Sequence, residues 1–406
     1  MPGSYQILLN GEPADADLYS AITSLEVEES LDMPGAVQLT VPIARTSNGD
    51  LTDVTDERFA PLANLAVVAT PGSADASNAV GGAVGAVAST FGGDAGKGSG
   101  AQCIFDGYVL SHKLHLETGI TNSTLAVWGQ DASWLMNLEE KVKEWVDVTD
   151  ADVANAIFRD RDYGITPADE NTADDSPSHT EAGHSLMQRG SDIQFLRSLA
   201  RRNGKFCRVA CADTPGARIG YFAKPKLDGD PAATLTLNDP ENWTVTSLDL
   251  DWDATRPTAV VARQALFTDD DPDGVSADTS DTGLPSLGDR SLADFTGKPM
   301  TVLLAAPVDD GGELTLRARS LLRESTWFVR CEGEADVERL GTVLRAGMVV
   351  AVVGLGALHS GRYLVWSVRH TIGQDSHTMK FVLVRNAVGG AAGGGASALA
   401  QLAGAL

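Results

Sequence analysis

Residues 24–41 read SLEVEESLDMPGAVQLTV, and this stretch decides the class of fold. Apolar side chains alternate with polar ones on both sides of a Pro-Gly pair: Leu25 and Val27 precede it, and Val37, Leu39 and Val41 follow it. An alternation with a period of two puts the apolar side chains on one face of a strand, and Pro-Gly is typical of a turn. The stretch therefore predicts a β-hairpin with one buried face.

Short apolar or alternating runs recur along the rest of the chain and predict further strands. They lie at 65–69, 103–110, 125–128, 234–237, 260–263, 349–353 and 363–368. From residue 206 onward the pattern predicts strands.

Two helices are expected between these strands, over 150–162 and 191–203. Thr149 with Asp152, and Ser191 with Gln194, resemble capping boxes at the two helix starts. The pattern is that of a β-rich α+β chain with a small helix-containing α/β region in the middle.

Residues 71–100 consist almost wholly of Gly, Ala, Ser, Val and Asp. This composition predicts a mobile loop inserted between two strands, and the alternative is a loop that orders on a partner. A Gly/Ala-rich flexible tail is expected over 389–406.

The charge balance restricts the partners. The 406 residues contain 55 Asp and Glu against 31 Lys and Arg, a net charge of −24. Such a chain repels phosphate groups, so neither nucleic-acid recognition nor binding to an anionic membrane is expected. No apolar run is long enough for stable membrane insertion, and no secretory signal is visible at the N-terminus. A cytoplasmic chain is therefore expected.

The sequence offers few groups for chemistry. His112 and His115 stand three apart in an alternating strand, which puts them on opposite faces. Cys207 and Cys211 share a face but lie about 13 Å apart at strand spacing, too far for one zinc ion. The four cysteines are too few for a disulfide scaffold in a chain of this length.

One segment resembles the opening of a calcium-binding loop. Asp269, Asp271 and Asp273 precede Gly274 in the pattern D-x-D-x-D-G, but position twelve is Ser280 where a bidentate Glu is needed. The three aspartates are a weak metal candidate beside the simpler interpretation of a solvated acidic loop. No catalytic residue and no cofactor is predicted.

Residues 188–204, QRGSDIQFLRSLARRNG, resemble the signature stretch of the phage late control protein D family. These are baseplate hub proteins of contractile phage tails, related to hubs of type VI secretion and contractile injection systems. The hairpin at 24–41, residues 105–131 and residues 345–365 resemble further parts of that family in the same order. The residues that carry the resemblance are Gly107, Asp131, Asp192, Phe195, Leu196, Leu199, Ala200, Gly204, Gly361 and Tyr363.

The resemblance implies four parts. Two tail-tube-like β-barrel domains are expected over 1–131, with the insertion at 71–100, and over 241–388. A helix-containing middle domain over 132–240 lies between them, and a tail over 389–406 follows.

The resemblance also implies a non-enzymatic function. Three subunits would form a homotrimer with six barrel lobes, a pseudo-hexameric ring that adapts the six-fold inner tube to a three-fold spike. The expected partners are the inner tube protein, a separate spike protein and baseplate wedge proteins, within an assembled tail or injection particle. Two alternatives stay open: a tail-associated cell-wall hydrolase, and a calcium-dependent binding module.

Overall fold

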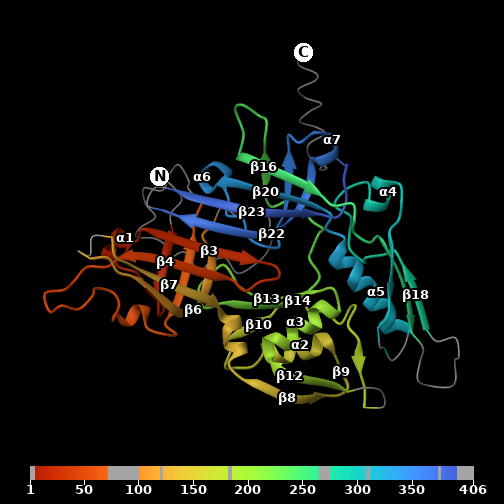
Figure 1. The fold of residues 1–406 in the computed structure, drawn as a ribbon, viewed down its shortest axis with the longest axis horizontal. Coiled ribbons are helices and arrows are strands. Elements are labelled where there is room, and N and C mark those ends of the chain that lie inside the picture. Colours follow the sequence, from red (N-terminus) through yellow and green to blue (C-terminus); the bar gives the residue numbers. More distant parts are fainter. Residues whose placement is uncertain are drawn as a thin grey trace.

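The computed structural model describes residues 5–71, 100–118, 122–181, 185–264, 275–306, 308, 311–373 and 376–390 (Figure 1). Asp269, Asp271 and Asp273 lie outside the described residues, as do nearly all of the 71–100 insertion and most of the 389–406 tail.

The chain is built around one 13-stranded sheet, to which residues from both ends of the sequence contribute. Its longest path runs β16-β20-β23-β22-β3-β4-β7-β6-β5-β1-β2, with β21 beside β22 and β15 beside β21. The N-terminal strands are β1 (Tyr5–Leu9), β2 (Glu12–Pro13), β3 (Ser24–Ser30), β4 (Ala36–Pro42), β5 (Asn64–Ala69), β6 (Gln102–His115) and β7 (Thr124–Asp131). The C-terminal strands are β15 (Thr234–Thr236), β16 (Val245–Trp252), β20 (Val329–Asp336), β21 (Val349–Val353), β22 (Gly361–Ile372) and β23 (His377–Arg385).

The predicted hairpin is confirmed. β3 and β4 pair antiparallel, with Leu25 opposite Leu39 and Val27 opposite Val37, and all four side chains are buried. The alternation of apolar and polar side chains predicted the hairpin correctly because one face of the hairpin packs into the core.

β22 pairs directly with β3, from Ser367 opposite Ser30 to Ile372 opposite Leu25. This lateral join merges the N-terminal and C-terminal strands into one sheet over one continuous hydrophobic core. The pairing among the described strands runs from β16 to β2 and closes no barrel. The chain is β-rich as predicted, whereas two tube-like barrels stay a prediction.

The middle of the chain forms a smaller unit with its own core. Helices α2 and α3 lie between the β13–β14 strands and the antiparallel pair of β8 and β12 (Figure 1). Its elements are η4 (Ala132–Asn137), β8 (Glu140–Trp145), β9 (Val148–Thr149), α2 (Asp150–Phe158), β10 (Ile165–Pro167), β11 (Ser178–His179), β12 (Leu186–Ser191), α3 (Asp192–Arg202), β13 (Phe206–Cys211) and β14 (Arg218–Ala223).

The two predicted capping boxes have different outcomes. Thr149 and Asp152 form the reciprocal hydrogen bonds at the start of α2, as expected. Ser191 occupies the N-cap of α3 but makes no capping hydrogen bond. It is the last residue of β12, and its hydroxyl donates to Asn137 Oδ1 at 2.7 Å instead.

A third unit corrects the expectation of strands alone after residue 206. Helix α5 (Gly311–Ser325) packs on a three-stranded sheet of β18 (Val275–Thr279), β17 (Ala259–Gln264) and β19 (Thr301–Leu304). Leu314, Ala318 and Leu322 recur every four residues and are buried against that sheet. The remaining short helices are α1 (Ala16–Ala21), η1 (Glu57–Phe59), α4 (Leu292–Thr296), α6 (Val337–Leu340) and α7 (Gly356–His359).

Among the residues that the structure describes, none of the helices combines the length and apolar character needed to cross a bilayer.

Candidate functional site

Asp131 ends β7 and fixes two neighbouring segments. Its carboxylate accepts hydrogen bonds from the backbone N–H of Gly35 at 2.5 Å and of Ser133 at 2.9 Å. Burial raises the pKa of Asp131, although both hydrogen bonds oppose the rise. The carboxylate thereby ties the β3–β4 turn to η4, where the middle unit begins.

Asp192 holds a buried polar network at the start of α3. Its carboxylate accepts hydrogen bonds from Lys141 Nζ at 2.8 Å, from the Tyr163 hydroxyl at 2.7 Å and from Gln188 Nε2 at 2.5 Å. Burial opposes ionisation, but these donors hold the pKa of Asp192 below its ordinary value. Both carboxylate oxygens of Asp192 therefore accept hydrogen bonds. Because the donors Lys141 and Gln188 belong to β8 and β12, the network fixes these two strands relative to α3.

The remaining signature residues of α3 build the core of the middle unit. Phe195, Leu196, Leu199 and Ala200 are buried there. Gly204 follows the helix with φ +61°, and a Cβ at this position would lie 2.9 Å from Ser320 Cα of α5. The glycine allows α3 and α5 to approach closely.

Gly107, Gly361 and Tyr363 lie elsewhere in the large sheet. A Cβ on Gly107 would be 2.0 Å from the Gln130 carbonyl oxygen of β7. Gly361 has φ +146° and faces the guanidinium of Arg385, which also stacks over the Tyr363 ring. The structure therefore distributes the signature residues over the sheet and the middle unit and brings them into no single site.

The metal candidates Asp269, Asp271 and Asp273 lie outside the described residues, so that site stays a prediction. No group of three or more His, Cys, Asp or Glu side chains that could hold an ion occurs within the described residues. His115 is exposed beside Glu117, with Nε2 at 3.2 Å from Oε1. All four cysteines are free, and the Cys211 thiol donates to the carbonyl oxygen of Cys103 at 2.6 Å.

Buried ion pairs join segments that are far apart in the sequence, one within the large-sheet part, one between that sheet and the middle unit, and one between the middle unit and α5. Arg345 donates to both oxygens of Glu29 at 2.6 Å and to the carbonyl oxygen of Cys211 at 3.3 Å. Burial lowers the pKa of Arg345, but the nearby Glu29 carboxylate outweighs it and raises that pKa overall. Glu29 and Arg345 are 316 positions apart in the sequence, so no local sequence pattern could have paired them.

Two further pairs act in the same way. Arg218 of β14 binds Asp106 of β6 at 2.8 Å, and Arg323 of α5 binds Asp175 of the middle unit at 2.6 Å. The units are thus held together by charged groups that are shielded from water.

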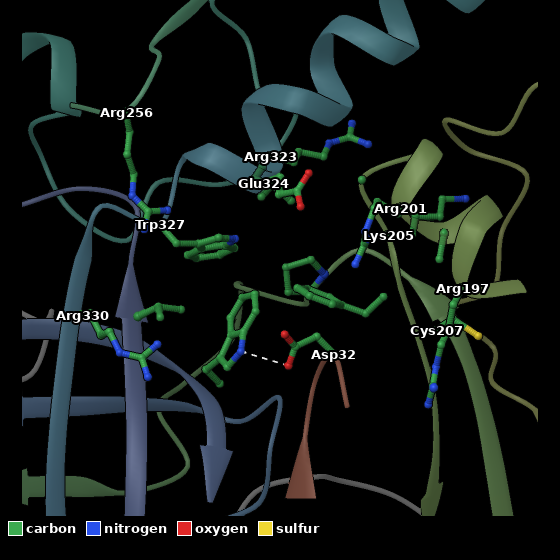
Figure 2. Close-up of a pocket in the computed structure, with 17 residues that line it drawn as sticks. Asp32, Arg197, Arg201, Lys205, Cys207, Arg256, Arg323, Glu324, Trp327 and Arg330 are labelled. Carbon is green, nitrogen blue, oxygen red and sulfur yellow. Dashed lines mark hydrogen bonds between the residues drawn. The ribbon is translucent and has the colours of Figure 1, made fainter. Parts of the chain in front are cut away.

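A pocket of about 310 Å³ lies where the three units meet (Figure 2). α3 and β13 form one side, the residues at and after the end of α5 form the second, and the large sheet with the β3–β4 turn forms the third. It is lined by Asp32, Arg197, Ala200, Arg201, Gly204, Lys205, Phe206, Cys207, Pro225, Arg256, Leu284, Arg323, Glu324, Trp327, Arg330, Trp366 and Val384.

Aromatic rings form a large part of the pocket wall. Trp366 lies edge-on to both Phe206 and Trp327, with ring centroids 5.2 and 6.4 Å apart. The Trp366 indole N–H donates to Asp32 Oδ1 at 3.1 Å, which fixes the ring (Figure 2). Lys205 is buried, its ammonium donates to Thr172 O and Ser176 Oγ at 3.2 and 2.8 Å, and burial lowers its pKa to about 8. Such a wall of rings with a few charged groups is typical of a binding site.

A family model described as the Alg8 N-terminal domain matches residues 93–374, more than two thirds of the chain. The chain belongs to the Alg8 N-terminal domain family. The matched region contains the whole middle unit and every residue that lines the pocket except Asp32 and Val384. The family description names a domain and states no activity. No curated protein matches the sequence.

Two solved structures with a similar fold are tail proteins. The 43 kDa tail protein of prophage MuSo2 from Shewanella oneidensis superposes with a TM-score of 0.61 at 13% identity, covering 95% of this chain and 98% of that one. A tail protein from Neisseria meningitidis MC58 gives 0.62 at 12% identity, with 95% and 97% covered.

A third similar structure is an E. coli component of the type VI secretion system, described as structurally similar to T4 bacteriophage tail proteins. Its TM-score is 0.51 at 12% identity, with 93% of this chain and 76% of that one covered. The chain therefore has a tail-protein fold over nearly its whole length. The finer resemblance to the late control protein D family stays a prediction.

Proposed function

We propose that the protein is a structural baseplate hub of a contractile tail or injection system. The observation that carries the proposal is the shared fold with tail proteins over 95% of the chain. The proposed role is assembly and involves no catalysis.

The lateral join suggests how the hub is built. Within one chain, β3 and β22 bring an N-terminal and a C-terminal set of antiparallel strands side by side in one sheet. Three chains joined by a repeated head-to-tail contact would place six such sets in a ring, and cyclic contacts of this kind close at a defined subunit number. This homotrimer would match a six-fold inner tube on one face and a three-fold spike on the other.

The sheet edges support an assembled form. Among the described strands, β16 pairs with β20 alone, and the strand path ends at β2 on the other side. Strand edges that stay open in a soluble protein invite pairing with another chain. We propose that subunit contacts in the ring cover these edges, and that tube, spike and wedge proteins complete the baseplate within a particle.

The acidic character is consistent with a conduit. A net charge of −24 would reduce adhesion of nucleic acid or acidic cargo that passes through the ring.

The proposal is tested by negative-stain electron microscopy and light-scattering mass determination on the same purified sample. The expected result is three times the chain mass of 42.5 kDa and a three-fold ring with six lobes. A monomer that stays a monomer after addition of its spike protein would contradict the hub assignment. A cell-wall degradation assay on that sample is expected to show no activity, and wall hydrolysis would favour the enzyme alternative.

A further inference from the structure

The pocket in Figure 2 carries an inference of its own, because its charge is opposite to that of the chain. The molecule has a net charge of −24, yet six basic residues line the pocket against two acidic ones. Arg197, Arg201 and Lys205 lie at one end of it, and Arg256 and Arg330 lie at the other (Figure 2).

Several of these basic groups are already neutralised within the chain. Arg256 pairs with Asp253 at 3.3 Å, Arg323 with Asp175 at 2.6 Å and Arg330 with Glu332 at 2.9 Å. These pairs leave α3 as the part of the pocket where basic charge is not balanced.

Arg197 and Arg201 stand four residues apart on the same face of α3. Neither forms an ion pair or a side-chain hydrogen bond in the described part of the chain, and the Nε of Arg197 is buried without a partner. Guanidinium groups bind carboxylates with paired hydrogen bonds, so a carboxylate suits this position.

The centre of the pocket requires an apolar group. Trp327, Trp366 and Phe206 present ring faces and edges there, and Leu284, Pro225 and Val384 extend the apolar surface. Asp32 is held by the Trp366 indole, and Glu324 is exposed at the rim. About 310 Å³ accommodates one or two side chains and excludes a folded element.

We propose that this pocket binds a short acidic peptide segment of a partner protein, with a carboxylate on Arg197 and Arg201 and a neighbouring apolar side chain among the tryptophans. The observation that favours an acidic peptide is the charge complementarity offered at the α3 end, where Arg197 and Arg201 form no ion pair among the described residues, next to an apolar centre. The pocket lies within one chain, so the proposal does not depend on the proposed trimer.

The test uses isothermal titration calorimetry on the full chain with a nine-residue peptide, Gly-Ser-Glu-Leu-Glu-Phe-Glu-Ser-Gly, blocked at both ends. Two matched peptides carry Gln for every Glu, or Ala for Leu and Phe. The Glu peptide is expected to bind at least about tenfold more tightly than either control. Raising the salt from about 50 mM to about 300 mM should weaken its binding.

The variants locate the site. The double variant Arg197→Gln, Arg201→Gln should bind the Glu peptide at least about tenfold more weakly, under conditions in which its thermal transition shows that it is still folded. Arg189→Gln changes an exposed arginine on β12 outside the pocket and should bind like the wild type. Light scattering on the same samples reports the subunit number separately.

Any of three results would overturn the proposal. The first is the absence of binding by the wild type at about 1 mM of the Glu peptide. The second is equal binding of the Glu and Gln peptides, and the third is unchanged binding by the Arg197 and Arg201 double variant.

Discussion

Glu28 and Glu29 are neighbours on β3, yet they stand in opposite environments. Glu29 is 7% exposed and pairs with Arg345, whereas Glu28 pairs with Arg369 on the solvent side of the sheet. Arg345→Met leaves the Glu29 carboxylate buried without a partner, and we expect a loss of about 3–5 kcal/mol in the free energy of unfolding. Arg369→Met, the matched control, should cost less than about 1 kcal/mol. Urea denaturation at one fixed protein concentration measures the free energy of unfolding of both variants. Equal losses would contradict the conclusion that the Glu29–Arg345 pair is buried and the Glu28–Arg369 pair is exposed.

The buried pair His370 and His377 makes stability depend on pH. Nδ1 of His370 lies 3.0 Å from Nε2 of His377, and both rings are almost fully buried between β22 and β23. Burial lowers the pKa of His377 to about 4 and that of His370 well below its ordinary value. The unfolded chain takes up these protons near pH 6.5, so it binds more protons than the folded chain as the pH falls below that value.

We therefore expect the free energy of unfolding to fall by about 2 kcal/mol per histidine between pH 7 and pH 5, with no further loss from His377 below about pH 4. His377→Gln should reduce this pH dependence in urea denaturation. The matched control, His115→Gln, changes an exposed histidine and should leave it unchanged. A pH dependence that is identical in all three proteins would contradict the prediction.

At the scale of the element, the contact between α3 and α5 depends on a residue without a side chain. Gly204 has φ +61°, and a Cβ there would lie 2.8 Å from Arg323 Cδ and 2.9 Å from Ser320 Cα. Gly204→Ala combines backbone strain with a steric clash, so we expect a loss of about 2–4 kcal/mol in stability. Gly297 at the end of α4 has φ +68° and open space around it, so Gly297→Ala should cost about 1 kcal/mol from strain alone. Thermal and urea unfolding measure the loss of stability in both variants. Equal losses for Gly204→Ala and Gly297→Ala would show that α3 and α5 move apart without cost.

Sequence patterns predicted some of the helices and strands and missed others. Periodicity predicted the β3–β4 hairpin and α2 because each buries one face, and the Thr149–Asp152 box is a local contact. α5 was missed although its buried residues recur every four positions, because the flanking strands dominated the pattern. Ser191 was misjudged because β12 leads straight into α3, and its hydroxyl is occupied by Asn137.

The pocket could not be predicted from such patterns. Its walls come from the β3–β4 turn, α3, β13, the α5 end and β22, and no local pattern indicates that these segments, which lie far apart in the sequence, meet. The ion pair between Glu29 and Arg345 likewise depends on long-range packing and on no local rule.

At the scale of the whole molecule, the lateral join predicts that the N-terminal and C-terminal strands unfold together. β3 and β22 share a ladder from Ser367–Ser30 to Ile372–Leu25, above a core to which both sets contribute. Native-state hydrogen exchange in increasing denaturant should give these two strands the same free energy of opening. The β17–β18–β19 sheet with α5, which has a separate core, serves as the comparison. Opening of β3 at much lower free energy than β22 would show that the two sets are independent.

The lateral join also has a consequence for synthesis on the ribosome. β3 leaves the ribosome early, whereas the strand that completes its other side is encoded more than 330 residues later. At bacterial rates of about 5–20 residues per second, β3 waits roughly 17 to 70 s for that partner. During this interval one edge of the nascent hairpin is open to other chains emerging from the same messenger. Translation speed and chaperone supply should therefore determine the soluble yield of this protein.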